Sequence, residues 1–102
     1  MSINKLSILI PAYNEANTIH EILNKVKDVA LLNNLEKEII IVDDCSTDNT
    51  TEVLESYIKV HPELNIQLYS QEINKGKGAA IHKGIELASG DFLVVLSIIC
   101  SF

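Results

Sequence analysis

The sequence predicts an α/β domain with a doubly wound, mainly parallel sheet and helices on both faces. Two observations lead to this fold class. Short apolar runs alternate with amphipathic stretches of helical period, in the order strand, helix, strand, helix, strand, helix, strand. One run, Ile39 to Val42, consists of four β-branched residues without a polar break, which is typical of a strand buried on both faces. The alternation implies parallel strands joined by right-handed crossovers.

The first strand is predicted at Leu6 to Ile10, and Pro11 is expected to stop it. A helix should begin near Asn17 or Thr18, because Thr18 and Glu21 have the spacing of a capping box. The apolar face of this helix follows helical spacing and consists of Ile19, Ile22, Leu23, Val26 and Val29. A turn at Asn33 and Asn34 then leads into the buried second strand.

The second strand ends in Asp43 and Asp44, and Asn49 or Thr50 should cap the second helix that follows. The apolar positions of this helix are Val53, Leu54, Tyr57 and Ile58. The remaining predicted elements are a half-exposed strand at Asn65 to Tyr69, a helix at Ala79 to Ala88 closed by Gly90, and a strand at Phe92 to Leu96.

Composition limits the classes of function. The chain has 102 residues, enough for one small domain, and a net charge of −6 with eight lysines and no arginine. Such a charge is a poor match for the backbone of a nucleic acid, so no nucleic-acid partner is expected. Cys45 and Cys100 have no metal-binding spacing and suit a reducing cytoplasm. We find no signal peptide, and the apolar end from Phe92 to Phe102 is shorter than the about 20 residues of a membrane span.

Three loops of this fold should meet on one edge of the sheet, since the strand-to-helix loops of a parallel sheet all lie at the carboxyl ends of the strands. They are Pro11 to Glu15, Asp43 to Thr50, and Asn74 to Gly78. Together they offer an aromatic ring, several carboxylates, two lysines and the backbone N–H groups freed by two glycines. A nucleotide requires this mixture, with an apolar wall for the base, acceptors for its N–H groups and the ribose, and cations for its phosphates.

Each feature also has a plainer structural explanation. Asp43 and Asp44 could only shape the strand-to-helix turn, although adjacent like charges need partners or solvent. Gly76 and Gly78 could form a turn, the two loop lysines could be solvated surface charges, and Tyr13 could belong to the core. Asp91 starts a strand at the opposite edge and is predicted to be structural. Neither the dinucleotide-binding glycine pattern nor a P-loop is present in the sequence.

Four blocks of this chain, in order and at suitable spacing, resemble those of the family 2 glycosyltransferases. They are Pro11-Ala12-Tyr13-Asn14-Glu15, Val42-Asp43-Asp44-Cys45-Ser46-Thr47-Asp48-Asn49-Thr50, Asn74-Lys75-Gly76-Lys77-Gly78 and Gly90-Asp91-Phe92-Leu93-Val94-Val95. The third block is most similar to the dolichol-phosphate mannosyltransferase and polyprenyl-phosphate glycosyltransferase group. The resemblance covers nearly all 102 residues and implies a single partial domain, the amino-terminal nucleotide-binding half of such an enzyme.

The resemblance also implies a substrate and a site. The expected donor is a UDP- or GDP-linked hexose, and the acceptor in the group is a polyprenyl or dolichyl phosphate. Pro11, Ala12, Tyr13 and Glu15 would line the nucleoside pocket, and Asp43 would meet the base. Asp44 and the loop of Lys75, Gly76, Lys77 and Gly78 would shape the pocket. We expect a cytoplasmic location, peripheral at the cytoplasmic face of a membrane.

One departure from the family pattern concerns catalysis. The family carries an Asp-x-Asp motif that holds Mg²⁺ or Mn²⁺ on the donor diphosphate, and alignment on Gly90-Asp91 places it at Ser97, Ile98 and Ile99, where no carboxylate occurs. We therefore predict no catalytic or metal-ligating residue in this chain. The chain is expected to be truncated before the motif and to be inactive, or nearly so, alone.

Two other classes of function remain open. The first is a non-catalytic nucleotide-binding or regulatory module that works by association with another chain, since the apolar fourth strand would expose an unpaired edge. Self-association through that strand is one form of it. The second is a phospho-acceptor signalling domain, which also carries acidic residues at strand ends. It fits less well, because its acidic pair should follow the first strand, where this chain has Pro11.

Overall fold

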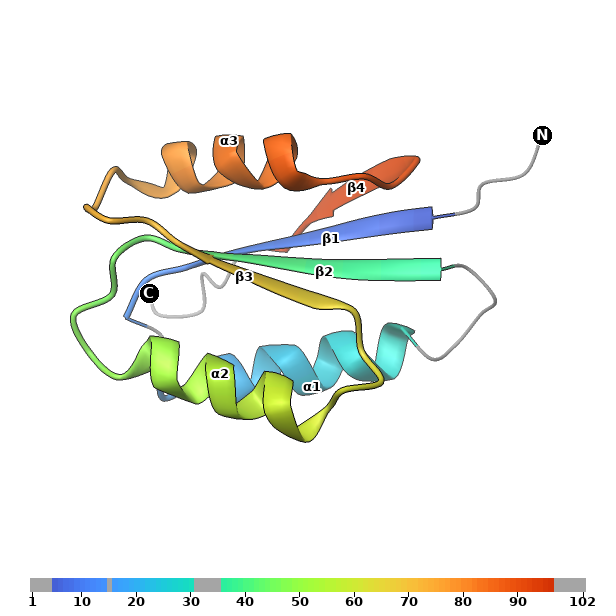
Figure 1. The fold of residues 1–102 in the computed structure, drawn as a ribbon, viewed down its shortest axis with the longest axis horizontal. Coiled ribbons are helices and arrows are strands. Elements are labelled where there is room, and N and C mark those ends of the chain that lie inside the picture. Colours follow the sequence, from blue (N-terminus) through green and yellow to red (C-terminus); the bar gives the residue numbers. More distant parts are fainter. Residues whose placement is uncertain (1–4, 15, 31–35, 97–102) are drawn as a thin grey trace.

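The computed structural model describes residues 5–14, 16–30 and 36–96 and contains an alternating α/β fold. Its elements are β1 (Lys5–Ala12), α1 (Ile19–Ala30), β2 (Glu36–Asp43), α2 (Thr50–Val60), β3 (Ile66–Ser70), α3 (Lys77–Leu87) and β4 (Phe92–Val95). The four strands form one parallel sheet in the order β3-β2-β1-β4. The helices α1 and α2 cover one face, and α3 covers the other (Figure 1). The predicted fold class is confirmed.

The two central strands carry the core because their side chains are buried on both faces. Residues of β1 and β2 pair in register, with Ile8 opposite Ile39 and Ile10 opposite Ile41. These residues form a cluster with the helices α1 and α2, whereas Leu9, Ile40 and Val42 pack with Ala80 of α3 on the other face. The predicted run Ile39 to Val42 is 2% exposed or less at every position, as a strand between two helical layers should be.

The helices begin close to the predicted positions. Thr18 directly precedes α1, and its carbonyl accepts hydrogen bonds from the N–H groups of Glu21 and Ile22. Among the predicted apolar residues, Ile19, Leu23 and Val26 are buried; the side chain of Val29 lies outside the described atoms. Asn49 is the N-cap residue of α2, but its side chain makes no capping hydrogen bond. Among the described segments, no helix is both long and apolar enough to cross a membrane.

Pro11 does not stop the first strand, so this prediction was wrong. The strand β1 continues through Pro11 to Ala12, and Pro11 pairs with Val42. The carbonyl of Leu9 accepts a hydrogen bond from the N–H of Leu96, beside β4, while the carbonyl of Ala12 faces β2 and accepts from Asp44. Backbone groups of successive residues in a strand point to opposite sides, so the nitrogen of Pro11 points to the same side as the carbonyl of Leu9. The pairing between β1 and β4 ends at Leu9 and Val95, so a proline nitrogen at position 11 interrupts none of these pairs.

The helix α3 can lie close to β1 at Gly84 because this residue has no side chain. A Cβ atom at this position would lie 2.0 Å from Cδ1 of Leu9, which is fully buried. In contrast, neither helical layer covers β4. Every residue from Phe92 to Leu96 is exposed, with Phe92 at 57%. The apolar fourth strand therefore lies at an open edge of the sheet.

A buried carboxylate holds together the amino ends of the strands. Glu38 of β2 is 1% exposed and accepts hydrogen bonds from Ser7 Oγ (2.6 Å), Ser89 N (2.6 Å), Ser89 Oγ (3.1 Å) and Gln67 Nε2 (3.3 Å). The ammonium group of Lys5 lies 3.3 Å from Oε1 of Glu38. Burial works to raise the pKa of Glu38, but the hydrogen bonds from Ser7, Ser89 and Lys5 outweigh it and lower the pKa to about 2. No local pattern in the sequence singles out Glu38.

Candidate functional site

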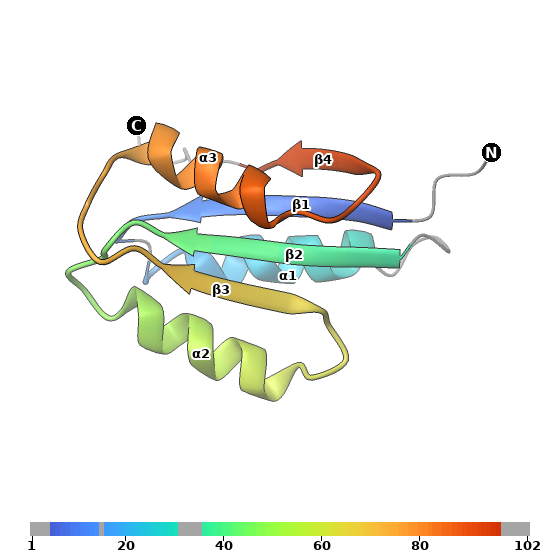
Figure 2. The same cartoon turned by 45° about the horizontal axis from the view of Figure 1, so that its top comes forward.

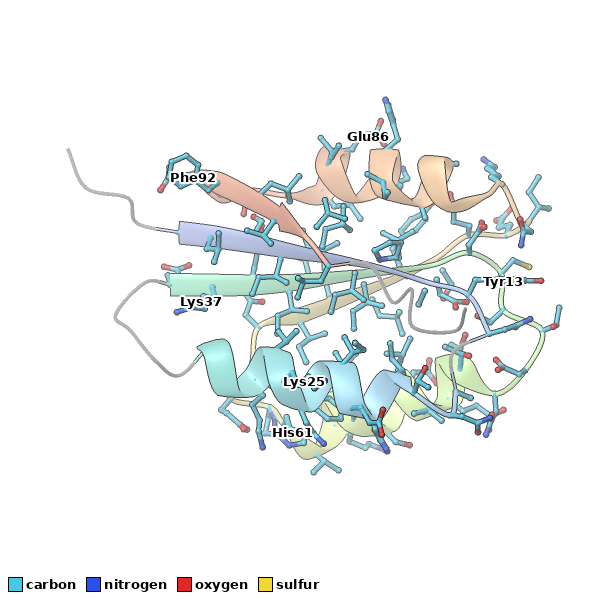
Figure 3. The ribbon with its side chains drawn as sticks, turned by 180° about the vertical axis from the view of Figure 1, so that it is seen from behind. Tyr13, Lys25, Lys37, His61, Glu86 and Phe92 are labelled. Carbon is cyan, nitrogen blue, oxygen red and sulfur yellow. The ribbon has the colours of Figure 1, made fainter. Side chains whose placement is uncertain are left out.

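The strand-to-helix loops converge on the carboxyl edge of the sheet, as predicted. All four strands point toward this edge, and the connections into the three helices lie there together (Figure 2). Main-chain hydrogen bonds join the ends of the strands: Asp44 N donates to Ala12 O and Gln71 N donates to Asp43 O, both at 2.8 Å. Tyr13 lies at this edge and Phe92 at the opposite end of the sheet (Figure 3).

Asp43 is the last residue of β2 and is 1% exposed. Its carboxylate accepts hydrogen bonds from the N–H of Ser46 (3.1 Å) and the hydroxyl of Thr51 (3.2 Å) at Oδ2, and from the hydroxyl of Ser46 at Oδ1. Because Thr51 belongs to the first turn of α2, these bonds fix the start of that helix against the end of β2.

Asp44 performs a similar task on the other side of the sheet and is 4% exposed. Its carboxylate accepts hydrogen bonds from Gln71 Nε2 (2.9 Å), Lys75 N (2.8 Å) and Gly76 N (2.8 Å). Gly76 has φ of +91°, a conformation that glycine adopts without strain, and it caps α3. The carboxylate therefore sets the shape of the loop that precedes α3.

The two adjacent aspartates avoid mutual repulsion because successive side chains of a strand point to opposite faces. Asp43 bonds to the α2 side and Asp44 to the α3 side. Each carboxylate accepts three hydrogen bonds from described residues. The structure thus gives both residues a role in shaping the turns, as the plainer explanation proposed, and this role is compatible with ligand binding.

Asn14 connects the first and second loops, and the sequence analysis missed it. Its Oδ1 accepts hydrogen bonds from Thr47 N (2.7 Å), Thr47 Oγ1 (3.3 Å) and Asp48 N (3.3 Å). Its own N–H donates to Ser46 Oγ (2.9 Å). The backbone of Asn14 has φ of +51°, a left-handed conformation that asparagine tolerates better than most residues. That preference, together with the position after a strand, was the available sequence signal.

Asp48, and not Asn49 or Thr50 as predicted, supplies the side-chain acceptor at the start of α2. Its Oδ1 accepts hydrogen bonds from the N–H (2.9 Å) and the hydroxyl of Thr50 at the start of α2, and its Oδ2 lies 3.5 Å from Ala16 N. Desolvation works to raise the pKa of Asp48, but the hydrogen bonds from Thr50 and Ala16 outweigh it and lower the pKa. The carboxylate therefore stays ionised and links the second loop to the first.

The other predicted site residues differ in accessibility. Tyr13 is 42% exposed and is not a core residue; Lys75 and Gly78 are also exposed. Pro11 and Ala12 are buried in β1, and Ala12 packs in the core with Ile10. Glu15 and the side chain of Lys77 lie outside the described atoms. At the opposite edge, Asp91 accepts a hydrogen bond from Lys5 N (3.1 Å), which confirms its predicted structural role.

Comparison with known proteins identifies the family. The family model described as glycosyl transferase family 2 matches residues 7–97, most of the chain. The chain belongs to this family. It is 36% identical over 98 residues to a dolichyl-phosphate beta-glucosyltransferase of Dictyostelium discoideum, covering 89% of this chain and 29% of that protein. It is 33% identical over 92 residues to the dolichol-phosphate mannosyltransferase of Pyrococcus furiosus, covering 90% and 25%. The chain thus spans less than a third of these relatives.

Solved structures of transferases share the fold. The mannosyltransferase PcManGT from Pyrobaculum calidifontis, in complex with GDP-Man and Mn²⁺, superimposes with a TM-score of 0.85 at 25% identity, covering 95% of this chain and 28% of that one. S. aureus TarS 1-349, in complex with UDP-GlcNAc, superimposes with a TM-score of 0.80 at 32% identity, covering 91% and 26%. Both the predicted family and its nucleotide-sugar transferase fold are therefore confirmed.

The residues at the carboxyl edge do not fit a divalent metal. Within residues 5–14, 16–30 and 36–96, no group of three or more His, Cys, Asp or Glu side chains is arranged to hold one. The carboxylates of Asp43 and Asp44 point to opposite faces, and each already accepts three hydrogen bonds from described residues. The aligned positions of the metal motif, Ser97 to Ile99, lie outside the described residues and have no carboxylate in the sequence. We assign no metal-dependent step to this chain.

Proposed function

We propose that this chain binds a UDP- or GDP-linked hexose at the carboxyl edge of its sheet. Within its family, this binding serves hexosyl transfer to an acceptor, which we propose to be a polyprenyl or dolichyl phosphate. The observation that carries the proposal is the joining of three loops into one edge: Asn14 joins the first loop to the second, and Asp44 joins the second to the third. An exposed ring, Tyr13, and an exposed lysine, Lys75, lie on those loops and can contact a base and a diphosphate.

We further propose that these 102 residues bind the donor without transferring its sugar. The leaving diphosphate develops concentrated negative charge, which a hard cation with carboxylate ligands stabilises. The described residues offer no such ligand group, and their carboxylates at this edge already serve the loops. We also propose a cytoplasmic location, peripheral at a membrane face. The free thiol of Cys45 is compatible with a reducing compartment.

The test is calorimetric titration of the purified chain with UDP-glucose and GDP-mannose, together with a radiolabel transfer assay to a polyprenyl phosphate with Mg²⁺ or Mn²⁺. We expect binding of one donor and no transfer. Lys75→Ala should weaken binding several-fold, and Lys59→Ala, an exposed lysine in the last turn of α2, should leave it unchanged. A folded chain that binds neither donor would refute the binding proposal, and measurable transfer would refute the proposed inactivity.

A second candidate is a nucleotide-binding module that acts by association through β4. A groove of about 380 Å³ lies between α1 and β4, lined by Leu6, Ile8, Ile22, Lys25, Val26, Val94 and Leu96. An unpaired strand edge beside an apolar groove favours pairing with another chain. Because β4 has only four residues, self-association through it should be weak. Light scattering across a hundredfold range of concentration tests this, and a monomer throughout would exclude self-association.

A further inference from the structure

The strand β4 has an outer edge without a partner strand among residues 5–14, 16–30 and 36–96, and it lies at the margin of the sheet beside β1 (Figure 2). The N–H of Leu96 donates to Leu9 of β1, and the two strands pair in constant register. Because backbone groups alternate along a strand, the N–H of Val94 also points to β1, whereas the backbone groups of Leu93 and Val95 point outward. Two N–H and two C=O groups are therefore available along this edge.

The sequence of β4 does little to protect this edge. Proteins commonly block an exposed edge with a charged residue, a proline or a bulge. The segment Phe92–Val95 contains no charged residue and no proline, and it pairs with β1 without an extra residue. All four side chains are apolar and exposed. An added strand would remove this apolar surface from water, although the shortness of β4 limits the number of hydrogen bonds that it could form.

An apolar groove of about 380 Å³ adjoins the edge, between α1 and β4. Val94 and Leu96 both line it, since side chains two residues apart lie on one face of a strand. Lys25 of α1 is the only charged residue among the described residues of the lining. It is exposed and makes no ion pair within the part of the chain that the structure describes. The groove thus accommodates apolar side chains on a segment that also brings a carboxylate to Lys25.

We propose that the outer edge of β4 and this groove bind an extended β-strand of polypeptide outside these 102 residues, with apolar side chains and one acidic residue. A strand supplies alternating N–H and C=O groups to Leu93 and Val95, which a lipid chain lacks. A second copy of this chain is a poorer match, because each copy has a net charge of −6 and Phe92–Val95 offers no carboxylate to Lys25.

The relatives contain ample polypeptide for this role. The chain spans 29% of the Dictyostelium discoideum relative and 25% of the Pyrococcus furiosus relative, so most of each relative has no counterpart in this sequence. The inference concerns a surface formed by β4 and α1 and does not depend on nucleotide binding.

The test uses a synthetic peptide of about six residues in which valine and threonine alternate and the last residue is glutamate. Amide hydrogen exchange of the whole chain is measured by NMR with and without this peptide, in the absence of nucleotide. At a peptide concentration about ten times the dissociation constant, exchange at Leu93 and Val95 should slow by about tenfold. Exchange at Val94 and Leu96, whose N–H groups already point to β1, should change little.

Matched controls separate strand pairing from apolar contact. The same peptide with every backbone nitrogen methylated has no donor and should not slow exchange. Replacing its glutamate with lysine should weaken binding several-fold, and Lys25→Gln should remove that difference, whereas Lys59→Gln on α2 should preserve it. Val95→Pro removes an outward N–H without removing a bond to β1 and should abolish binding of the peptide.

Three results would overturn the inference. Equal binding of the methylated peptide would mean that the groove takes an apolar ligand without strand pairing. Slower exchange at Leu93 and Val95 when the chain alone is concentrated would assign the edge to a second copy. Unchanged exchange at both amides with the peptide at about 1 mM would exclude a strand partner. The peptides decide the question on the unmodified chain even if Val95→Pro does not fold, and the proposed nucleotide binding stands or falls separately.

Discussion

Replacement of Glu38 by glutamine tests the buried polar cluster around this carboxylate. The change preserves the shape of the side chain and removes its charge, while Ser7, Ser89 and Lys5 still direct their donors at it. The amide nitrogen of glutamine is itself a donor, so one position of the cluster would place two donors against each other. Because Glu38 is 1% exposed, water cannot relieve this conflict.

The size of the effect follows from the pKa of Glu38, which the structure lowers from its ordinary value of 4.5 to about 2. One pKa unit equals about 1.4 kcal/mol, so the ionised form contributes on the order of 3 kcal/mol to folding. The folded-state pKa is lowered, so this stability is fully present above about pH 4.5 and is lost as pH falls toward about 2. A domain of this size has a total stability of about 5 to 15 kcal/mol, so the variant should still fold at neutral pH.

Urea denaturation followed by circular dichroism measures both the loss of stability and its dependence on pH. At pH 7 we expect Glu38→Gln to lower the urea midpoint by about 2 M, taking a slope of about 1.5 kcal/mol per molar urea. The difference from the unmodified chain should shrink as pH falls toward about 2, where Glu38 itself becomes protonated. The control is Glu36→Gln on the same strand. Glu36 lies 3.8 Å from the same Lys5 ammonium but is 67% exposed, so its loss should matter little. Equal midpoints for the two variants would refute the reasoning.

Three further predictions concern single contacts. Asp44→Ala should cost about 2 to 4 kcal/mol and should speed hydrogen exchange at the amides of Lys75 and Gly76, whose acceptor it removes; unchanged exchange there would contradict the assigned role. Gly84→Ala should destabilise by about 1 to 3 kcal/mol, because its Cβ would lie 2.0 Å from Leu9 Cδ1. Thermal unfolding of this variant alone and with Leu9→Ala should show a smaller penalty in the second background. Tyr57→Phe should cost about 1 kcal/mol through the lost hydrogen bond to Asn24 Oδ1, and an unchanged urea midpoint would show that this bond contributes nothing.

The periodicity of apolar residues in the sequence was sufficient to predict the fold, because most of these residues are buried between the sheet and the helices. The run from Ile39 to Val42 has to be buried on both faces, and Leu23 and Val26 have to face the sheet. Pro11 was misjudged because a proline excludes a strand only when its nitrogen faces a bonded neighbour. That depends on where β4 ends, which is a tertiary fact that no local pattern contains.

The candidate site was predictable only in outline. The order of strands and helices places the three loops on one edge, whatever the details of the loops. The contacts within that edge join residues far apart in sequence, such as Asn14 with Thr47 and Asp44 with Gly76. Asn14 and Asp48 were missed because asparagine and aspartate are common in any turn. Their importance depends on the partner that the fold brings to them.

The two edges of the sheet use buried carboxylates for different purposes. At the amino edge, the carboxylate of Glu38 has donors from two strands and from the turn before β4, together with the ammonium group of Lys5. This surplus of donors is what lowers its pKa so far. At the carboxyl edge, Asp43 and Asp44 have three donors each, drawn mainly from backbone N–H and hydroxyl groups of the loops and of the first turn of α2. Losing Glu38 should therefore lower stability while the loops of the proposed nucleotide site keep the hydrogen bonds that join them, because those bonds lie at the other edge of the sheet.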